Sequence, residues 1–288
     1  MSENFRCELH VHSTYSDGSV SPEGLLQHAA TIGLSVLAIT DHDNAGGARV
    51  ALPLADHYGI ELIPAIEFTS RWDGIWGPQT EAESDVLGYF IDPYHAAFQA
   101  REQASVADDF DRLAACCVRL TALGYPVAIE EVQAENPRFA GMRHLRDVLA
   151  KKGYAPSNWD AAKIANPVWE AGRKACFSLA EQVAMIHAAG GVAILAHPDF
   201  MNEGQPIQAA QVAALVEIGV DGLEAYHRML DALLTAHLQR LADQFGLLVT
   251  GGSDEHGWSP DLPHLGVQPV TRDMVEALRM RHETRVNK

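Results

Sequence analysis

The chain has 288 residues, and 47% of them are hydrophobic, which is enough for one large domain with a packed core. The formal net charge is -17 and no tract is rich in lysine and arginine. Such a surface repels long polyanions, so duplex nucleic acid is not an expected partner, although a local basic pocket for one small anion stays open.

Apolar runs alternate with helical patterns along the chain. The first run is followed by Ser21-Pro22-Glu23, where the serine can cap a helix and the proline can occupy its first position. That helix should end near Gly33, and a further helical stretch should run to about Tyr58. Later helices are expected at about 179–189, 207–218 and 229–245. The predicted strands cover residues 5–9, 35–40, 60–68, 85–90, 191–196, 222–226 and 247–250.

Strands that alternate with helices predict an α/β fold with a parallel sheet, closed here into a barrel. Residues 92–177 differ, because they show helical patterns punctuated by Pro, Gly and Asn but no convincing strand. We therefore predict a barrel of residues 1–91 and 178–288. Residues 92–177 would form a helical insertion that caps the site.

The remaining features concern cellular location. No apolar run is long enough to span a membrane, and the polar, charged N-terminal residues do not resemble a signal peptide. The cysteines Cys7, Cys116, Cys117 and Cys176 lack CxxC spacing, so we expect reduced and mostly buried thiols. A catalytic cysteine is a minor alternative that no local motif supports. A cytoplasmic protein is expected.

Histidines and carboxylates gather at the ends of the apolar runs. His10 and His12 project from one side of a strand end, because side chains of a strand alternate with period two. Glu67 ends a very apolar strand, where a carboxylate is costly unless it is paired or metal-bound. Asp254 and His256 repeat the period-two spacing. Imidazoles mixed with carboxylates are the ligands of a polynuclear zinc, manganese or iron site.

Other members of these clusters have plainer alternatives. Asp17 could be a solvated turn carboxylate, but its neighbours favour a metal ligand. Asp41 or Asp43 is expected to orient His42 rather than to bind a metal. His197 directly follows an apolar strand, and a satisfied core histidine is the alternative to a ligand there.

Five segments together resemble the motifs of the PHP (polymerase and histidinol phosphatase) family, in the family's order: ELHVHSTYSDGS, LAITDHD, IPAIEFT, VAILAHP and VTGGSDEHG. The resemblance covers nearly the whole chain, most closely residues 5–90 and 178–258, and the combination is highly specific. It implies a distorted (β/α)7 barrel with two or three divalent metal ions, often manganese, iron or zinc. The insertion resembles the subgroup that includes the 3′,5′-nucleoside bisphosphate phosphatase and related 5′-to-3′ exoribonucleases.

The resemblance also implies roles for individual residues. One ion would be held by His10, His12, Glu67 and Asp254, a second by Asp17, His42 and His256. Glu67 would bridge, or would join His197 at a third position. Metal-activated water would then attack phosphorus. The catalytic residues implied are Asp17, His42, Glu67, His197 and His256, and Asp41 or an unassigned histidine is the candidate general acid.

Two departures from the subgroup pattern concern the substrate. Asp85 stands where the subgroup usually has a histidine, which puts the third metal or one substrate contact in doubt. The insertion begins SVADDFDRLAACC instead of with a run of arginines, and its later arginine motif reads GMRH. We expect phosphate recognition from the surviving Arg112, Arg143 and His144, with His227 as a further polar contact. Pairing of the arginines with nearby acids, and an ordinary loop role for His227, are the alternatives.

These features predict a metal-dependent phosphatase or phosphoesterase acting on a small phosphorylated metabolite. A nucleoside 3′,5′-bisphosphate or a short oligonucleotide end is the leading substrate. An amidohydrolase-type carbon–nitrogen hydrolase is the first alternative, but such binuclear barrels usually carry a carboxylated lysine or an extra bridging carboxylate, and no lysine lies near a motif here. A metal-binding module that has lost turnover is the second. The oligomeric state stays open.

Overall fold

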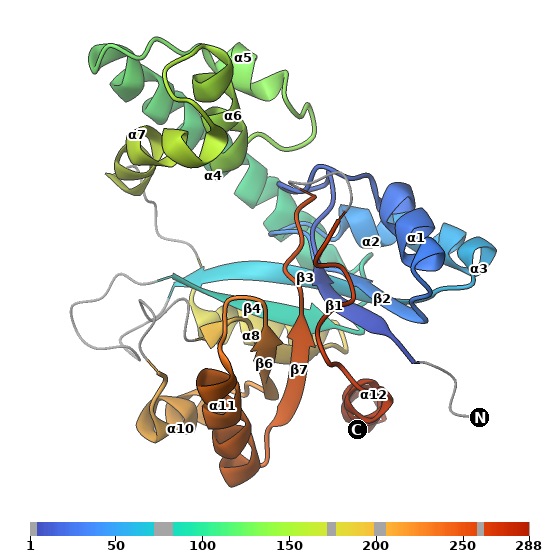
Figure 1. Ribbon diagram of the computed structural model, residues 1–288. Coiled ribbons are helices and arrows are strands. Elements are labelled where there is room, and N and C mark those ends of the chain that lie inside the picture. The colour runs from blue at the N-terminus through green and yellow to red at the C-terminus, as the bar shows by residue number, and fades with distance from the viewer. Residues whose placement is uncertain (1–4, 72–82, 172–176, 199–205, 258–261, 288) are drawn as a thin grey trace.

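A sheet whose strands follow one another in chain order forms the centre of the computed structural model (Figure 1), which describes residues 5–71, 83–171, 177–198, 206–257 and 262–287. Each predicted strand is present, with its ends shifted by a few residues. The strands are β1 (Cys7–Val11), β2 (Val36–Ile39), β3 (Glu61–Arg71), β4 (Glu83–Tyr89), β5 (Val192–Leu195), β6 (Gly222–His227) and β7 (Leu248–Gly252).

The sheet nearly closes, because the chain after β7 returns to β1. The Asp254 amide donates to the His10 carbonyl at 2.9 Å, and the His12 amide donates to the Glu255 carbonyl at 3.0 Å. Val11 and Glu255 form a parallel bridge at the same place. The predicted α/β barrel is confirmed, and its closure brings the two ends of the sequence's ligand set together.

The prediction of a parallel sheet is wrong for β4, which pairs antiparallel with both β3 and β5. The other neighbouring pairs are parallel. Only residues 72–82 separate β3 from β4. A parallel return needs a crossover of a dozen or more residues, so a connection this short favours the antiparallel direction. As a result, the first residues of β4 lie at the edge where β3 and β5 end.

Helices cover the sheet and begin at recognisable caps. Ser21 accepts from the Gly24 amide at 3.1 Å with Pro22 at the first helical position. Ser178 and Glu181 form a reciprocal capping box. The helices around the barrel are α1 (Pro22–Thr31), α2 (Gly46–Ala51), the 3₁₀ turn η1 (Leu52–Leu54), α3 (Ala55–Tyr58), α8 (Leu179–Ala188), α10 (Ala209–Glu217), α11 (Ala232–Phe245) and α12 (Arg272–Val286).

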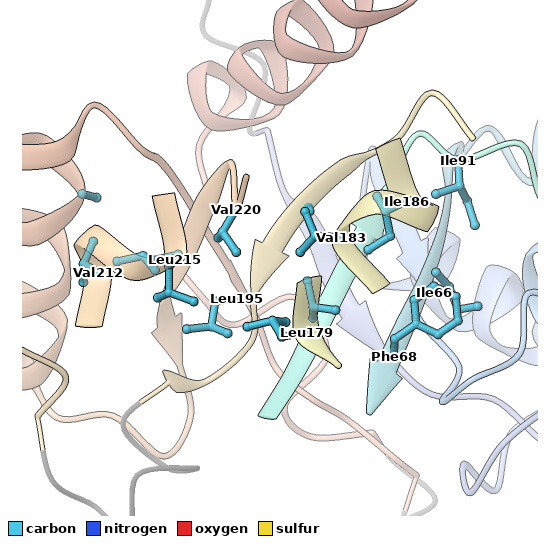
Figure 2. Packing of buried hydrophobic residues seen from close by; sticks show 14 of the residues in the cluster. Ile66, Phe68, Ile91, Leu179, Val183, Ile186, Leu195, Val212, Leu215 and Val220 are labelled. Carbon is cyan, nitrogen blue, oxygen red and sulfur yellow. The ribbon is translucent and has the colours of Figure 1, made fainter. Parts of the chain in front are cut away.

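Buried apolar side chains join these helices to the sheet. Figure 2 shows the largest cluster, in which Phe68 and Leu195 of the strands pack with Ile186 of α8 and Leu215 of α10. A second cluster joins the strands to α12, and a third joins β1 and β2 to α1 and α3. The barrel wall therefore has its own support, independent of the polar residues at the strand ends.

Residues 92–177 carry the helices α4 (Ala96–Ala122), α5 (Ile129–Gln133), α6 (Met142–Lys151) and α7 (Asn158–Ala171). The 27-residue α4 would be about 40 Å long at 1.5 Å per residue, and it runs from the barrel up into the group formed by α5, α6 and α7 (Figure 1). The four helices share a buried cluster of their own, which includes Leu113 and Cys116 of α4 and Leu145 of α6. This separate core supports the predicted division at residues 92 and 177, which stays a prediction.

The cysteines that the structure describes are buried, as expected. Cys7, Cys116 and Cys117 are free and buried, and burial raises the pKa of the Cys7 thiol to about 12. Cys176 lies outside the described residues. Within those ranges, no helix combines the length and apolar character needed to cross a membrane.

Candidate metal centre

The predicted ligands come together at one end of the barrel. His10 and His12 leave β1 on the same side, and both are fully buried. Asp254 and His256 follow β7, whose Gly252 lies against His10 so closely that a Cβ on it would overlap the histidine side chain. Glycine is required there because it allows β7 to approach β1. Closure of the barrel thus depends on the same residues that place the ligands.

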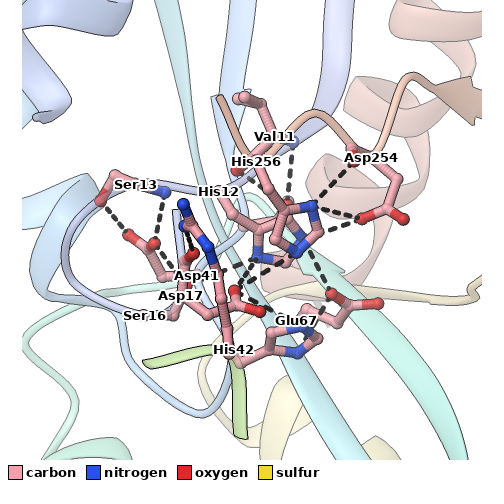
Figure 3. Close-up of polar contacts among 12 residues, drawn as sticks. Val11, His12, Ser13, Ser16, Asp17, Asp41, His42, Glu67, Asp254 and His256 are labelled. Atoms are coloured by element: carbon pink, nitrogen blue, oxygen red, sulfur yellow. Dashed lines mark hydrogen bonds and ion pairs between the residues drawn. The ribbon is translucent and has the colours of Figure 1, made fainter. Parts of the chain in front are cut away.

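Glu67 lies at the centre of the cluster (Figure 3). The sequence predicted that the strand ends at Glu67, but β3 continues to Arg71. The carboxylate therefore projects from within the strand. Its Oε2 atom lies 3.2 Å from Nε2 of both His10 and His12 and 3.3 Å from Nδ1 of His42. Its Oε1 atom lies 3.2 Å from His197 Nε2. One carboxylate therefore faces four imidazoles.

Three sets of ligand atoms are close enough to hold ions. The first contains His10, His12 and Glu67. Asp254 Oδ1 lies beside this set, 3.2 Å from His12 Nε2 and 3.5 Å from His10 Nε2. In the second, Asp17 Oδ1 lies 3.3 Å from His256 Nε2, and His12 and His42 complete the set. The grouping implied by the family resemblance therefore has a geometric counterpart, with His12 placed between the first two positions.

The third set contains the residue that departs from the subgroup pattern. Asp85 forms a possible ligand group with His42 and Glu67, and its Oδ2 atom lies 3.8 Å from His197 Nε2. Asp85 is near the start of β4, so the antiparallel direction of that strand places it at this edge. An aspartate here supplies an oxygen where a histidine would supply a nitrogen.

Burial and charge act against each other in the cluster. Burial opposes a charged His42, but the Glu67 and Asp17 carboxylates outweigh it and raise the pKa of His42 to about 10. Burial likewise opposes a charged His197, but the hydrogen bond and the charge of Glu67 outweigh it and raise the pKa of His197 to about 9. Burial, then the Glu67 charge, raise the pKa of Asp85 to about 7. Histidines bind metals in the neutral form, so metal binding here should release protons.

Unsatisfied atoms show that the residues fit divalent ions. His12 Nε2, Asp17 Oδ1, His42 Nδ1 and Asp85 Oδ1 are buried and make no well-aligned hydrogen bond among the described residues, although the first three lie 3.2–3.3 Å from an oppositely charged group. Such atoms are costly unless something binds them. All four belong to the three sets, and the mixed nitrogen and oxygen donors suit zinc, manganese or iron.

Backbone strain is concentrated at the same place. Asp43, His197 and Asp254 have φ values of 50°, 26° and 52°, in the left-handed region that non-glycine residues rarely adopt. Such conformations cost of order 1–3 kcal/mol each and persist where the surroundings enforce them. Two of these residues are predicted ligands and the third follows His42.

Two aspartates do not have the predicted role of orienting His42. Asp41 accepts hydrogen bonds from the Ser13 amide, the Ser13 hydroxyl and the Ser16 hydroxyl, at 2.7, 2.7 and 2.8 Å, and so fixes the loop after β1. Asp43 instead pairs with Arg101 Nη2 at 2.9 Å. The sequence reasoning did not consider Arg101, a buried residue of α4. An arginine on the barrel-facing side of α4 is the sequence feature that could have indicated this contact.

A cavity of about 220 Å³ opens beside the metal centre and runs beneath the insertion. Asp17, His42 and Asp43 line its barrel side. Arg101, Arg112 and Arg143 line it from α4 and α6, together with the acidic Asp108 and Asp109 of α4. Two of the predicted phosphate contacts, Arg112 and Arg143, therefore border the cavity.

The other predicted substrate contacts are placed differently. His144 accepts from the Gly141 amide at 3.2 Å, caps α6, and lines a neighbouring cavity together with Thr14. His227 Nε2 lies 3.5 Å from Asp254 Oδ2, and its Nδ1 accepts from the Met229 amide at 3.2 Å. His227 thus contacts a predicted metal ligand, and a substrate role for either histidine stays a prediction.

The described lysines lie on the insertion and not at the ligand cluster. Lys151, Lys152 and Lys163 pair with acids on the insertion, not with the cluster. Lys174 and Lys288 lie outside the described residues. Among the described residues, no lysine is present to be carboxylated between two metals.

Comparison with known proteins gives one consistent family. The PHP domain family matches residues 8–126. A 5′-3′ exoribonuclease of Haemophilus influenzae is 31% identical over 87% of this chain and 91% of its own length. A phosphoribosyl 1,2-cyclic phosphate 1,2-diphosphodiesterase of Eggerthella lenta is 30% identical over 90% of this chain and 97% of its own. A 3′,5′-nucleoside bisphosphate phosphatase of Chromobacterium violaceum is 26% identical, covering 93% of this chain and 95% of the relative.

A solved structure agrees with these relatives. The crystal structure of a putative metal-dependent phosphoesterase from Bifidobacterium adolescentis superposes with a TM-score of 0.82 at 27% identity, covering 97% of each chain. The resemblance drawn from the motifs is confirmed, and so is the barrel of that type. The relatives' names share phosphoester hydrolysis but differ in substrate.

Proposed function

Because this chain belongs to the PHP family of metal-dependent phosphoesterases, we propose that it hydrolyses a small nucleotide, with a nucleoside 3′,5′-bisphosphate or a short oligonucleotide end as the leading substrate. The observation that carries the proposal is the cavity beside Asp17 and His42, which Arg101, Arg112 and Arg143 line although the chain has a net charge of -17. A phosphate dianion needs such partners, and arginine matches its geometry.

The arginines are held in place before any substrate binds. Arg101 pairs with Asp43, and its guanidinium lies 4.6 Å from the Phe177 ring centre. The Arg112 guanidinium lies 4.1 Å from the Trp169 ring centre and donates to the Trp169 carbonyl at 3.3 Å. Groups fixed in this way lose little conformational entropy on binding, which favours affinity for a small anion.

A second cavity supports a nucleotide over a simple sugar phosphate. It shares Asp109 and Phe139 with the first cavity, so the two adjoin. Val106 and Phe110 of α4 line it, and both side chains are exposed. Apolar and aromatic walls beside a phosphate site suit a base, since stacking of a base on an aromatic side chain contributes about 1–3 kcal/mol.

The residues divide the work of hydrolysis. Divalent ions held by the strand-end ligands would activate water and neutralise charge on the phosphoryl oxygens. Glu67 would fix the relative positions of the ligand sets, because its two oxygens reach histidines of all three. The arginines would hold the phosphate over the centre, and the insertion would restrict bulk water around it.

A substrate screen tests the proposal. Phosphate release should be measured with manganese on a nucleoside 3′,5′-bisphosphate, a nucleoside monophosphate, a short 5′-phosphorylated oligoribonucleotide and ribose 5-phosphate. We expect kcat/KM for the best nucleotide to exceed that for ribose 5-phosphate by about tenfold or more, given the energy of base stacking. Preference for ribose 5-phosphate would refute the nucleotide, and hydrolysis of none would favour a module without turnover.

Replacement of Arg143 by alanine tests the phosphate contact. Its guanidinium donates to the Asp17 carbonyl and lies 3.9 Å from Asp147, so pairing with an acid is the competing role. A contact with phosphate is worth about 1.5–3 kcal/mol, so we expect kcat/KM to fall about ten- to a hundredfold. Lys151→Ala, which removes an exposed charge from the same helix, should leave the kinetics unchanged. Unchanged kinetics in Arg143→Ala would place Arg143 outside the substrate site.

A further inference from the structure

Glu224 is a fully buried carboxylate in β6 that contacts two of the histidines at the metal centre. Its Oε1 atom accepts a hydrogen bond from His10 Nδ1 at 3.0 Å. Its Oε2 atom accepts one from the His197 backbone amide, also at 3.0 Å. The two oxygens of one side chain are therefore divided between β1, which carries His10, and the segment after β5, which carries His197.

The bond to His10 determines which ring nitrogen is available to a metal. A carboxylate accepts but does not donate, so His10 must carry its proton on Nδ1. When a metal displaces the second ring proton, the lone pair is on Nε2, the nitrogen that faces Glu67 Oε2 at 3.2 Å and Asp254 Oδ1 at 3.5 Å. This is the arrangement in which an outer carboxylate orients a ligating histidine.

The bond to His197 acts on the backbone instead. His197 has a φ of 26°, which is costly for a residue with a side chain. The Glu224 carboxylate holds the amide of this strained residue, and the ring then reaches Glu67 Oε1 with its Nε2 at 3.2 Å. The two histidine rings stack with their centres 5.7 Å apart.

We propose that Glu224 is a positioning residue that orients His10 and His197 together. It thereby couples the ion position at His10, His12 and Glu67 to the third position, where His197 lies beside Glu67 and Asp85. The second position, formed by His12, Asp17, His42 and His256, contains neither His10 nor His197, and it should keep its affinity for an ion when Glu224 is replaced. This inference rests on the metal centre and not on the proposed nucleotide substrate.

Glu224→Gln is the informative variant because it preserves shape but cannot make both bonds. An amide has one oxygen and one NH2 group, so either an N–H donor faces the NH2 group or His10 moves its proton to Nε2, the nitrogen that a metal would need. Asp221→Asn is its matched control. Asp221 is also buried, lies three residues earlier, and likewise accepts from a histidine ring (His187 Nε2, 2.9 Å) and a backbone amide (Ala193, 2.9 Å). Neither partner is a candidate metal ligand.

The experiment is a titration of metal-free full-length protein with manganese in competition with a chelator. In Glu224→Gln we expect one or two ions to bind about 10–100-fold more weakly, and at least one to keep the wild-type affinity. Asp221→Asn should keep all wild-type affinities, although it should unfold more readily. Because the measurement is binding, it is separate from any failure on nucleotides.

Three results would overturn the proposal: unchanged affinities in Glu224→Gln, equal weakening of every ion, or equal weakening in Asp221→Asn. Circular dichroism confirms that each variant is folded. If Glu224→Gln does not fold, Glu224→Asp replaces it, since a side chain shorter by one methylene cannot span the same two donors. Wild-type affinities in Glu224→Asp would then refute the coupling.

Discussion

Replacing Glu67 with glutamine should reduce metal-dependent phosphate release by at least about a hundredfold, the upper end of what residues supporting a metal site normally contribute. Glu67 is fully buried, and its two oxygens lie 3.2–3.3 Å from nitrogens of His10, His12, His42 and His197. Glutamine keeps the shape but removes the negative charge and one of the two oxygens. Two of the three ligand sets lose a ligand oxygen, and the third contains His12 and His42, which contact Glu67, so all three should bind ions more weakly.

The Glu67→Gln measurement needs a control on the same strand. Glu61 lies at the start of β3, is exposed, and pairs with Arg279 at the surface. Glu61→Gln should release phosphate at the wild-type rate. More than a tenth of wild-type activity in Glu67→Gln, with saturating manganese, would show that this carboxylate is not shared between the ions.

Replacing His12 with alanine should have the second-largest effect, again a loss of about a hundredfold or more. His12 Nε2 lies 3.2 Å from both Glu67 Oε2 and Asp254 Oδ1, and its Nδ1 lies 3.9 Å from Asp17 Oδ1. The imidazole thus lies between two of the ligand sets. Both phosphate release and the number of tightly bound ions should fall.

The fold should survive the His12 substitution, because the apolar clusters that support the barrel do not include the ligand set. Far-UV circular dichroism of the metal-free variant should match that of the metal-free wild type. His57→Ala, an exposed histidine of α3, should change neither activity nor metal content. An unfolded His12→Ala would mean that the site and the barrel stabilise one another.

The sequence predicted the ligands well because each depends on a local rule. Period-two alternation places His10 and His12 on one side of β1, and buried strands make a carboxylate such as Glu67 conspicuous. Strand ends of a barrel meet at one edge, which brings His197 and His256 to the same place. None of these rules requires knowledge of which strand pairs with which.

Features that depend on strand direction or on distant packing were missed. The antiparallel β4 brings Asp85 to the edge where β3 ends, and alternation of strands and helices gave no sign of that reversal. Glu224 carried the same signal as Glu67, a carboxylate in an apolar strand, but the sequence reasoning did not apply the rule to it. His144 caps α6, a role that only the neighbouring Gly141 amide reveals.

The substrate depends on distant packing most of all. The cavity walls come from the segments around Asp43, Arg101, Phe139, Trp169 and Phe177, which are brought together by α4 and the insertion. The relatives' names show phosphoester substrates as different as RNA ends, a cyclic phosphate and a bisphosphate.

Elemental analysis tests the central claim most directly, since the account depends on ions held at the strand ends. Protein expressed with manganese, iron or zinc supplied, and purified without chelators, should contain at least two divalent metal ions per chain. The reason is that three groups of ligand atoms converge around Glu67 and Asp17 with buried atoms left unsatisfied. Less than one ion per chain would contradict the polynuclear centre and the mechanism built on it.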